Sequence, residues 1–329
     1  MQTASTDWKE QVGADEAAQF AGYAQVFAAI QARKSQKYGK GRGLHRKQLL
    51  GVRGRFEIAA DLPEFARQGL FTSPGRFECV VRLSNGGFDR APDRVPDIRG
   101  FGVRVNGVNG PSALGEGAAT HQDFLLINQE SFAFPKSEEF VAFAAAASNG
   151  NGALLRHLFK RYGLFGAPAR LVKMLKTVAR AFAGFAVEPM HSAVPIANGA
   201  FAVRVRLLPV AANGAADPAA KADWGADFSR RLAERDLAWD LQLQPYVDET
   251  TTPIEDASVN WTTPYTTAAR LTLAKQDTNA PEGRALAQEL EAGIFDPWQG
   301  LAAHRPLGEV QRARRVVYFT SQKGRGAVG

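Results

Sequence analysis

Residues 76–87 read RFECVVRLSNGG, a run of strand-forming residues that ends in the turn signal Asn85-Gly86-Gly87. Valine and aromatic residues suit a pleated, half-buried surface, and glycine supplies the backbone angles that tight turns need. Similar segments lie on both sides, with strand patterns at 55–60, 99–105 and 123–128 and turn signals at 72–75 and 106–107. Successive strands joined by short turns predict an antiparallel sheet or barrel rather than strands that alternate with crossover helices.

The rest of the chain adds helices and further strands. Sequence patterns predict helices at 17–33, 137–183, 219–235, 281–292 and 308–318, and strands at 201–208, 238–246 and 269–274. No linker rich in proline or glycine divides the chain, so we expect a single domain over residues 1–329 with a flexible tail at 1–16. The predicted fold class is α+β, an antiparallel barrel core with surrounding helices.

Composition places the chain among globular proteins with a sizeable core. It has 329 residues, of which 45% are hydrophobic and 22% are charged. The lone cysteine, Cys79, cannot form an internal disulfide, and its alternating context indicates a small buried hydrophobe. The first residues lack the apolar stretch of a secretory signal, and no run of about eighteen apolar residues marks a membrane span. We therefore expect a cytoplasmic protein that does not cross a membrane.

The chain is basic, with a net charge of +7 and a pI of about 9.6. Such an excess can serve nucleic acid, but no RNP, zinc-finger or helix-turn-helix pattern is present, so we expect no nucleic-acid partner. The densest basic run, residues 33–47, contains His45. Part of this run could serve the carboxylates of a bound cofactor, and the simpler alternative is a solvated arm. The sequence leaves a homo-oligomer open.

Arg314 stands four residues before Tyr318 near the end of the chain. Positions i and i+4 share one face of a helix, so the guanidinium can reach the phenol oxygen. A tyrosine phenol binds metal poorly because it loses its proton only near a pKa of about 10, and a neighbouring cation favours the phenolate. The pair is therefore consistent with a tyrosinate ligand, although a surface helix with a basic stripe explains it better when it is taken alone.

His45, three residues after Arg42, has the most distinctive setting of the five histidines. Histidine can take and return a proton near neutral pH, which suits general acid–base catalysis. His121, His157 and His304 lie in segments that indicate structural roles. His45 is therefore the candidate acid–base residue.

Five segments of the chain, in order, resemble those of haem catalases. Residues 42–58 resemble the distal segment, where an arginine precedes the distal histidine by three positions. Arg82-Leu83-Ser84 is similar to the catalase strand that carries a propionate-binding arginine and a serine that orients the histidine. The other matches are residues 97–101, which resemble Asp-Pro-Arg-Gly-Phe, residues 123–134 around Asn128, and the proximal pair Arg314 and Tyr318. Each motif is weak alone, but five in the family's order, within residues 20–329, are specific together.

The resemblance implies a catalase-like antiparallel β-barrel, haem b as cofactor and a set of site residues. Tyr318 would be the axial ligand of the haem iron, beside Arg314. His45 would move protons, with Ser84 orienting its ring and Asn128 polarising the peroxide. The haem would also be contacted by Arg42, Arg82 and Arg325 at its propionates and by Leu44 above its face.

The expected activity is haem-dependent consumption of hydrogen peroxide or an organic hydroperoxide, with an electron donor as second substrate. Residues 295–308 resemble the short bacterial haem proteins related to catalases. Leu44 stands where the family usually has valine, and Ile127 and Gln129 flank Asn128 where glycine and a second asparagine are usual. These changes could widen the distal pocket and leave room for organic hydroperoxides.

Two other function classes stay open. One is isomerisation of a fatty-acid hydroperoxide, as in allene-oxide-synthase-like haem enzymes, on the same scaffold. The other is a non-catalytic haem carrier or sensor, against which His45 and Asn128 argue because a carrier needs no acid–base pair. The chain ends eleven residues after Tyr318, whereas typical catalases continue into a helical domain, so the nicotinamide site of larger members is not expected.

Overall fold

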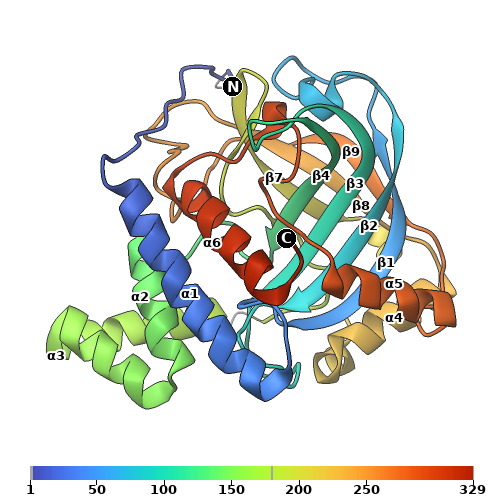
Figure 1. Cartoon of the computed structure of the whole chain (residues 1–329). Helices are drawn as coiled ribbons and strands as arrows, with labels where there is room; N and C mark the ends of the chain where they lie inside the picture. Colours follow the sequence, from blue (N-terminus) through green and yellow to red (C-terminus); the bar gives the residue numbers. More distant parts are fainter. Residues whose placement is uncertain (1–2, 179–180, 329) are drawn as a thin grey trace.

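A closed antiparallel β-barrel forms the centre of the protein (Figure 1). The computed structural model describes residues 3–178 and 181–328, except for the side chains of residues 173–178. Within these residues one antiparallel sheet has the strand order β5-β4-β3-β2-β1-β9-β8-β7-β6. β5 also pairs with β7, so that eight strands close the barrel and β6 forms a short arm on β7. The strand bounds are β1 Lys47–Ile58, β2 Arg76–Asn85, β3 Arg99–Pro111, β4 Ala118–Ile127, β5 Met190–His191, β6 Ile196–Asn198, β7 Phe201–Pro209, β8 Leu237–Pro245 and β9 Thr266–Leu273.

Helices pack around the outside of this barrel (Figure 1). α1 lies along α6 and against α2, α3 lies beyond α2, and α5 packs on β1. The helix bounds are α1 Glu16–Tyr38, α2 Ser137–Ser148, α3 Asn151–Val178, α4 Trp224–Glu234, α5 Pro281–Ala292 and α6 Glu309–Arg325. Short 3₁₀ turns in the described residues are η1 Gly69–Phe71, η2 Ala211–Asn213, η3 Pro218–Ala222 and η4 Ala302–His304.

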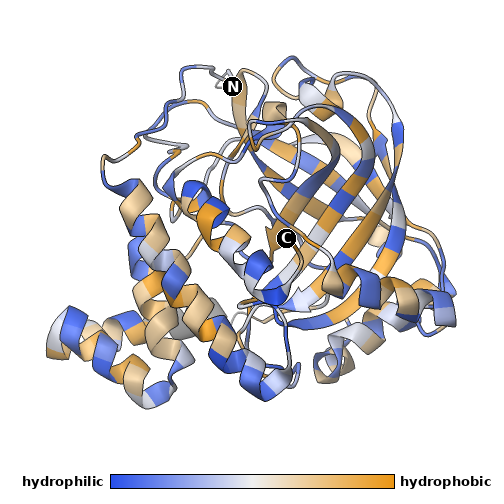
Figure 2. Ribbon diagram, in the orientation of Figure 1, coloured by the Kyte–Doolittle hydropathy of each residue, from blue (hydrophilic) through white to orange (hydrophobic). Residues whose placement is uncertain are grey.

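The interior of the barrel is filled by large apolar side chains. Trp239 is fully buried, with its ring stacked 6.0 Å from Phe228 and meeting the edge of Phe101 at 5.4 Å. Apolar and polar residues alternate along the strands in Figure 2, as expected because successive side chains point to opposite faces of a sheet. Cys79 is buried in this core as predicted, and burial followed by Glu78 raises the pKa of its thiol to about 12.

The second half of β2 is buried on both faces, which creates the setting of the site. Val81 and Leu83 point into the barrel core, so Arg82 and Ser84 must point outward. Both outward side chains are nevertheless buried. Helices packed on the outer wall therefore enclose polar groups that a bare sheet would expose to water.

The predicted strands are confirmed, and several are longer than their sequence patterns indicate. β1 begins at Lys47 rather than at residue 55, because residues 47–54 pair with residues 79–85 of β2. The predicted helix 137–183 is two helices, α2 and α3, and Gly163 interrupts α3 with a φ of 68°; residues 179 and 180 lie outside the described part. The last helix continues to Arg325 instead of ending at Tyr318. The short strands β5 and β6 were not predicted.

Residues 3–15 contain no helix or strand but follow the surface of the fold. Trp8 Nε1 donates to the carbonyl of Ala200 at 2.8 Å, and the backbone N–H of Gln11 donates to Glu255 at 2.8 Å. The flexible tail and the single domain stay predictions. No helix in the described residues has the length and hydropathy needed to cross a bilayer.

Candidate functional site

A cavity of about 450 Å³ lies between the outer wall of the barrel and the helices packed against it. Strands β2, β3 and β4 form one side, and α1, α2 and α6 form the other. Aromatic side chains line much of it, including Phe27, Phe132, Phe134, Phe140 and Phe143. A largely apolar cavity with a few converging polar groups, in the range of about 300–1,000 Å³, is typical of small-molecule and cofactor sites.

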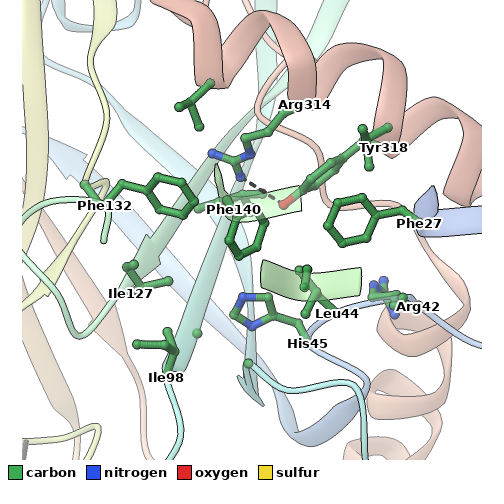
Figure 3. A pocket seen from close by; sticks show the side chains of 18 of the residues that line it. Phe27, Arg42, Leu44, His45, Ile98, Ile127, Phe132, Phe140, Arg314 and Tyr318 are labelled. Atoms are coloured by element: carbon green, nitrogen blue, oxygen red, sulfur yellow. Dashed lines mark hydrogen bonds between the residues drawn. The ribbon is translucent and has the colours of Figure 1, made fainter. Parts of the chain in front are cut away.

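Eight of the nine predicted site residues line this cavity. They come from the segment after α1, from β2 and from α6, and are Arg42, Leu44, His45, Arg82, Ser84, Arg314, Tyr318 and Arg325. Figure 3 shows Arg314 and Tyr318 projecting from α6 on one side of the cavity, and His45 and Leu44 on the opposite side. The fold thus brings together the two ends of the sequence.

Arg314 and Tyr318 form the pair that their spacing predicts. The guanidinium Nη2 donates to the phenol oxygen at 2.9 Å, and Nη1 donates to Gln311 Oε1 at 2.9 Å. Both contacts are made within α6, so helix geometry alone sets the guanidinium beside the oxygen. This oxygen faces the cavity (Figure 3).

His45 is held from several directions. Its Nδ1 shares a hydrogen bond of 3.0 Å with Ser84 Oγ, and its backbone N–H donates to the carbonyl of Gly86 at 2.9 Å. Its φ of 50° lies in the left-handed region, which is uncommon for a residue with a side chain. A Cβ on Gly100, opposite Ser84 in the β2–β3 register, would lie 2.5 Å from the imidazole Nδ1 and 2.8 Å from Ser84 Oγ. A glycine at position 100 is therefore what leaves room for the His45–Ser84 pair.

The surroundings of His45 keep its ring neutral. Burial, and then the nearby cations of Arg82, Arg314 and Arg42, lower the pKa of His45 from its usual 6.5 to about 3. A neutral imidazole retains a nitrogen that can accept a proton. The ring is therefore neutral, with one nitrogen able to accept, over the whole physiological pH range.

Asn128 is the predicted residue that the fold does not bring into the cavity wall. It follows β4, is buried, and accepts from the backbone N–H of Arg99 at 2.8 Å through Oδ1. Its neighbours Ile127 and Gln129 line the cavity instead. In this arrangement Asn128 joins the ends of β3 and β4.

Glu291 is a charged member of the site that sequence reasoning missed. It lies in the last turn of α5, and its carboxylate accepts from Arg42 at 3.0 Å and from Arg82 at 2.7 Å. Arg42 and Arg325 also each donate to the carbonyl of Gly293 at 2.7 Å. No local motif marks this residue, because its partners lie more than 200 positions earlier in the sequence.

Arg170 of α3 is a second charged group that the sequence did not assign to the site. It lines the cavity, and its Nη2 donates to Glu139 at 3.1 Å. Its guanidinium lies 5.4 Å from the centre of the Phe134 ring. Its buried Nε has no hydrogen-bond partner among the described residues.

The donor set fits a flat, apolar cofactor that carries carboxylates at one edge. Tyr318 offers a phenol oxygen on one side and His45 an imidazole on the other (Figure 3). At the α5 end, the three guanidinium groups of Arg42, Arg82 and Arg325 face the single carboxylate of Glu291. This excess of two positive charges suits a ligand with two carboxylates, and haem carries two in its propionates.

Comparison with solved structures supports the fold. A fungal catalase matches with a TM-score of 0.65 and 16% identity over 87% of this chain and 59% of its own. Catalase A from Saccharomyces cerevisiae matches with a TM-score of 0.67 and 16% identity, over 87% of this chain and 61% of its own. A bacterial catalase matches with a TM-score of 0.64 and 14% identity, over 100% of this chain and 64% of its own. This chain thus spans about three fifths of the length of these three catalases.

Neither a scan against protein-family models nor a search of curated proteins found a match. At identities of 14–16% the structural likeness concerns the fold. The protein therefore has a catalase-like α+β fold, an antiparallel β-barrel with surrounding helices.

Proposed function

We propose that this protein is a haem-dependent oxidoreductase that consumes peroxides with the help of an electron donor. The observation that carries the proposal is the placement of two pairs on opposite sides of one apolar cavity: Arg314 with Tyr318, and His45 with Ser84. The catalase-like fold supports it, because known catalases share this architecture. Overall, a hydroperoxide and two reducing equivalents from the donor would yield an alcohol and water.

Haem b would supply the iron at which the peroxide O–O bond is cleaved. Tyr318 would bind that iron through its phenolate oxygen, and the Arg314 guanidinium would stabilise the negative oxygen. Leu44 and the aromatic side chains of the cavity would pack on the ring and exclude water.

His45 would carry the proton transfers. As a neutral base it would take the proton from the oxygen of the incoming peroxide and return it to the oxygen that leaves. The bond to Ser84 holds the ring in one orientation, so that no reorientation is needed between the two transfers. The contact between Asn128 and the peroxide stays a prediction, because Asn128 does not line the cavity and its Oδ1 accepts from the Arg99 N–H.

Arg42, Arg82 and Arg325 would bind the two carboxylates of haem. Two of them already contact Glu291, so that carboxylate must share or release them when the cofactor binds. Arginine pairs with carboxylates through two parallel hydrogen bonds, which fixes direction as well as charge. Glu291 would therefore tune cofactor affinity.

The substrate class that the cavity favours is an organic hydroperoxide, although hydrogen peroxide would also enter. Phe132, Phe134 and Phe140 give the wall an apolar surface, and Arg170 adds a positive charge to it. The same observation favours a second candidate, isomerisation of a fatty-acid hydroperoxide, which consumes no donor. A cytoplasmic location and a homo-oligomer remain proposals from the sequence.

The decisive experiment is the absorption spectrum of the protein purified with haem, followed by three assays. Oxygen release from hydrogen peroxide, donor oxidation with cumene hydroperoxide, and donor-free conversion of a fatty-acid hydroperoxide distinguish the three reactions. Donor oxidation by the parent protein, lost in Tyr318→Phe, supports the proposal. Failure to bind haem would overturn it, and donor-free conversion alone would assign the isomerase.

A further inference from the structure

The excess positive charge of the chain lies in one segment. The whole protein has 40 Lys and Arg against 33 Asp and Glu. Residues 140–187 contain no acidic residue and seven basic ones, so the remainder has 33 of each and is neutral. The seven are Arg156, Lys160, Arg161, Arg170, Lys173, Lys176 and Arg180.

This segment includes α3, which lies beyond α2 at the lower left edge of the molecule in Figure 1. Gly163 divides the helix into two arms, which we call the α3 hairpin (residues 151–178). Leu158 and Ala167 are buried, so one face of the hairpin is packed. Arg161 and Arg170 lie 3.7 and 3.1 Å from Glu139 of α2.

Large apolar side chains are exposed on the same hairpin. Leu164 and Phe165, next to the break at Gly163, are 76% and 95% exposed. Leu155, Phe159 and Val172 are also exposed. Exposed apolar side chains grouped on one element mark an interaction surface, whereas single ones need no explanation.

We propose that the α3 hairpin docks on the surface of an anionic lipid bilayer. Leu164 and Phe165 would enter the boundary between head groups and acyl chains, and the exposed Arg156 and Lys160 would contact the anionic head groups. An anionic bilayer binds elements that combine an apolar tip with a basic face. The docked hairpin lies in the interface and does not cross the bilayer.

Two other occupants fit less well. A second copy of this chain, docked by twofold symmetry, would place two hairpins without acidic residues against each other, and their charges would repel. Nucleic acid would use the cations but leave Leu164 and Phe165 in water. An anionic bilayer uses both features.

Docking here would also place the bilayer beside the cavity. Arg170 of the hairpin and Phe143 of α2 both line it. An apolar peroxide that leaves the lipid would then reach the site with little exposure to water. The docking itself does not depend on haem or on the reaction.

The test is flotation of the full-length protein with vesicles of phosphatidylcholine alone or of phosphatidylcholine mixed with phosphatidylglycerol. We expect binding to the anionic vesicles only, weakened by added salt because ions screen exposed charges. Leu164→Ser with Phe165→Ser, and separately Arg156→Glu with Lys160→Glu, should each lower the partition coefficient by roughly tenfold or more.

Matched controls alter the same properties elsewhere. Leu114→Ser changes another exposed apolar residue, and Lys221→Glu with Lys275→Glu makes the same change in net charge. Both should bind as the parent does, and circular dichroism melting confirms that each variant is folded. Equal losses in the controls, or no preference of the parent for anionic vesicles, would overturn the proposal. The proposal would also be overturned if the parent protein did not bind vesicles but formed an oligomer, or bound DNA, and the hairpin variants lost that property.

Discussion

The Arg314 guanidinium donates a hydrogen bond to the phenol oxygen of Tyr318 over 2.9 Å, one helical turn along α6. The contact places a permanent positive charge at the oxygen that faces the cavity. This arrangement, a guanidinium donor bonded to a phenol oxygen at the cavity, is what makes Tyr318 the candidate metal ligand.

Removal of the Tyr318 oxygen should abolish the ligand. We expect Tyr318→Phe to lose the tyrosinate-type absorption spectrum or to fail to retain haem. Tyr38→Phe is the matched control, because the Tyr38 hydroxyl bonds to Asp89 and does not line the cavity. A Tyr318→Phe protein that binds haem with the parent spectrum would remove Tyr318 from the site.

His45→Ala should keep haem and slow peroxide consumption. General acid–base catalysis typically contributes about 10²–10⁴-fold, and stopped-flow mixing with peroxide measures that loss. Burial and three arginines hold the pKa of His45 at about 3. Titration of His45 should therefore cause no change in the rate of the parent protein between about pH 5 and 9. His157→Ala, outside the cavity wall, is the control. Equal rates in His45→Ala and the parent contradict the assignment.

Arg42→Ala, Arg82→Ala and Arg325→Ala should each weaken haem binding, whereas Glu291→Gln should strengthen it. The neutral amide no longer competes for Arg42 and Arg82, so those guanidinium groups become available to the cofactor. Titration of the haem-free variants measures the affinity, with Arg53→Ala, an exposed residue on β1, as control. Unchanged affinity in all three arginine variants would remove these residues from cofactor binding.

Gly100→Ala should disturb the His45–Ser84 pair without removing either residue. The new methyl group would lie 2.5 Å from His45 Nδ1, so the ring must move. We expect a loss of peroxide turnover that approaches that of His45→Ala and a loss of stability of about 1–3 kcal/mol. Gly22→Ala on α1 is the control: nothing lies within 4 Å of its Cβ, so it should gain about 0.4–1 kcal/mol. A Gly100→Ala variant with full turnover would show that the ring tolerates displacement.

Acid should destabilise the protein through its buried histidines. Burial is the main cause that lowers the pKa of His45 to about 3 and of His304 to about 4, both below the usual 6.5. The unfolded chain therefore binds protons first, and stability present above pH 6.5 is lost as the pH falls toward these values. Asp296 acts in the opposite direction, because burial raises its pKa to about 6.

Urea unfolding midpoints at several pH values test this expectation. His45→Gln should reduce the dependence on pH below 6.5, whereas His157→Gln should change it less. A parent protein equally stable at neutral pH and well below 6.5 would show that these rings take up protons without loss of the fold.

Short-range patterns in the sequence were enough to predict many local features of this protein. Strand patterns and turns predicted most barrel strands, and the spacing of Arg314 and Tyr318 predicted their contact, because a helix sets neighbours four positions apart. Motif order predicted that Arg42, His45, Ser84 and other site residues share one cavity. Such features depend on residues that are close in the sequence or on short motifs, and both can be read from a single sequence.

Contacts between distant segments depend on how the elements pack and could not be predicted from local patterns. Glu291 meets Arg42 across 249 positions because α5 packs against the barrel, and nothing around residue 291 announces it. Asn128 bonds to Arg99 rather than lining the cavity because the register of β3 and β4 places its amide at the strand ends. Closure through the two-residue strand β5 likewise depends on its partners, not on its own pattern. Periodicity records which face a residue takes, whereas packing decides which faces meet.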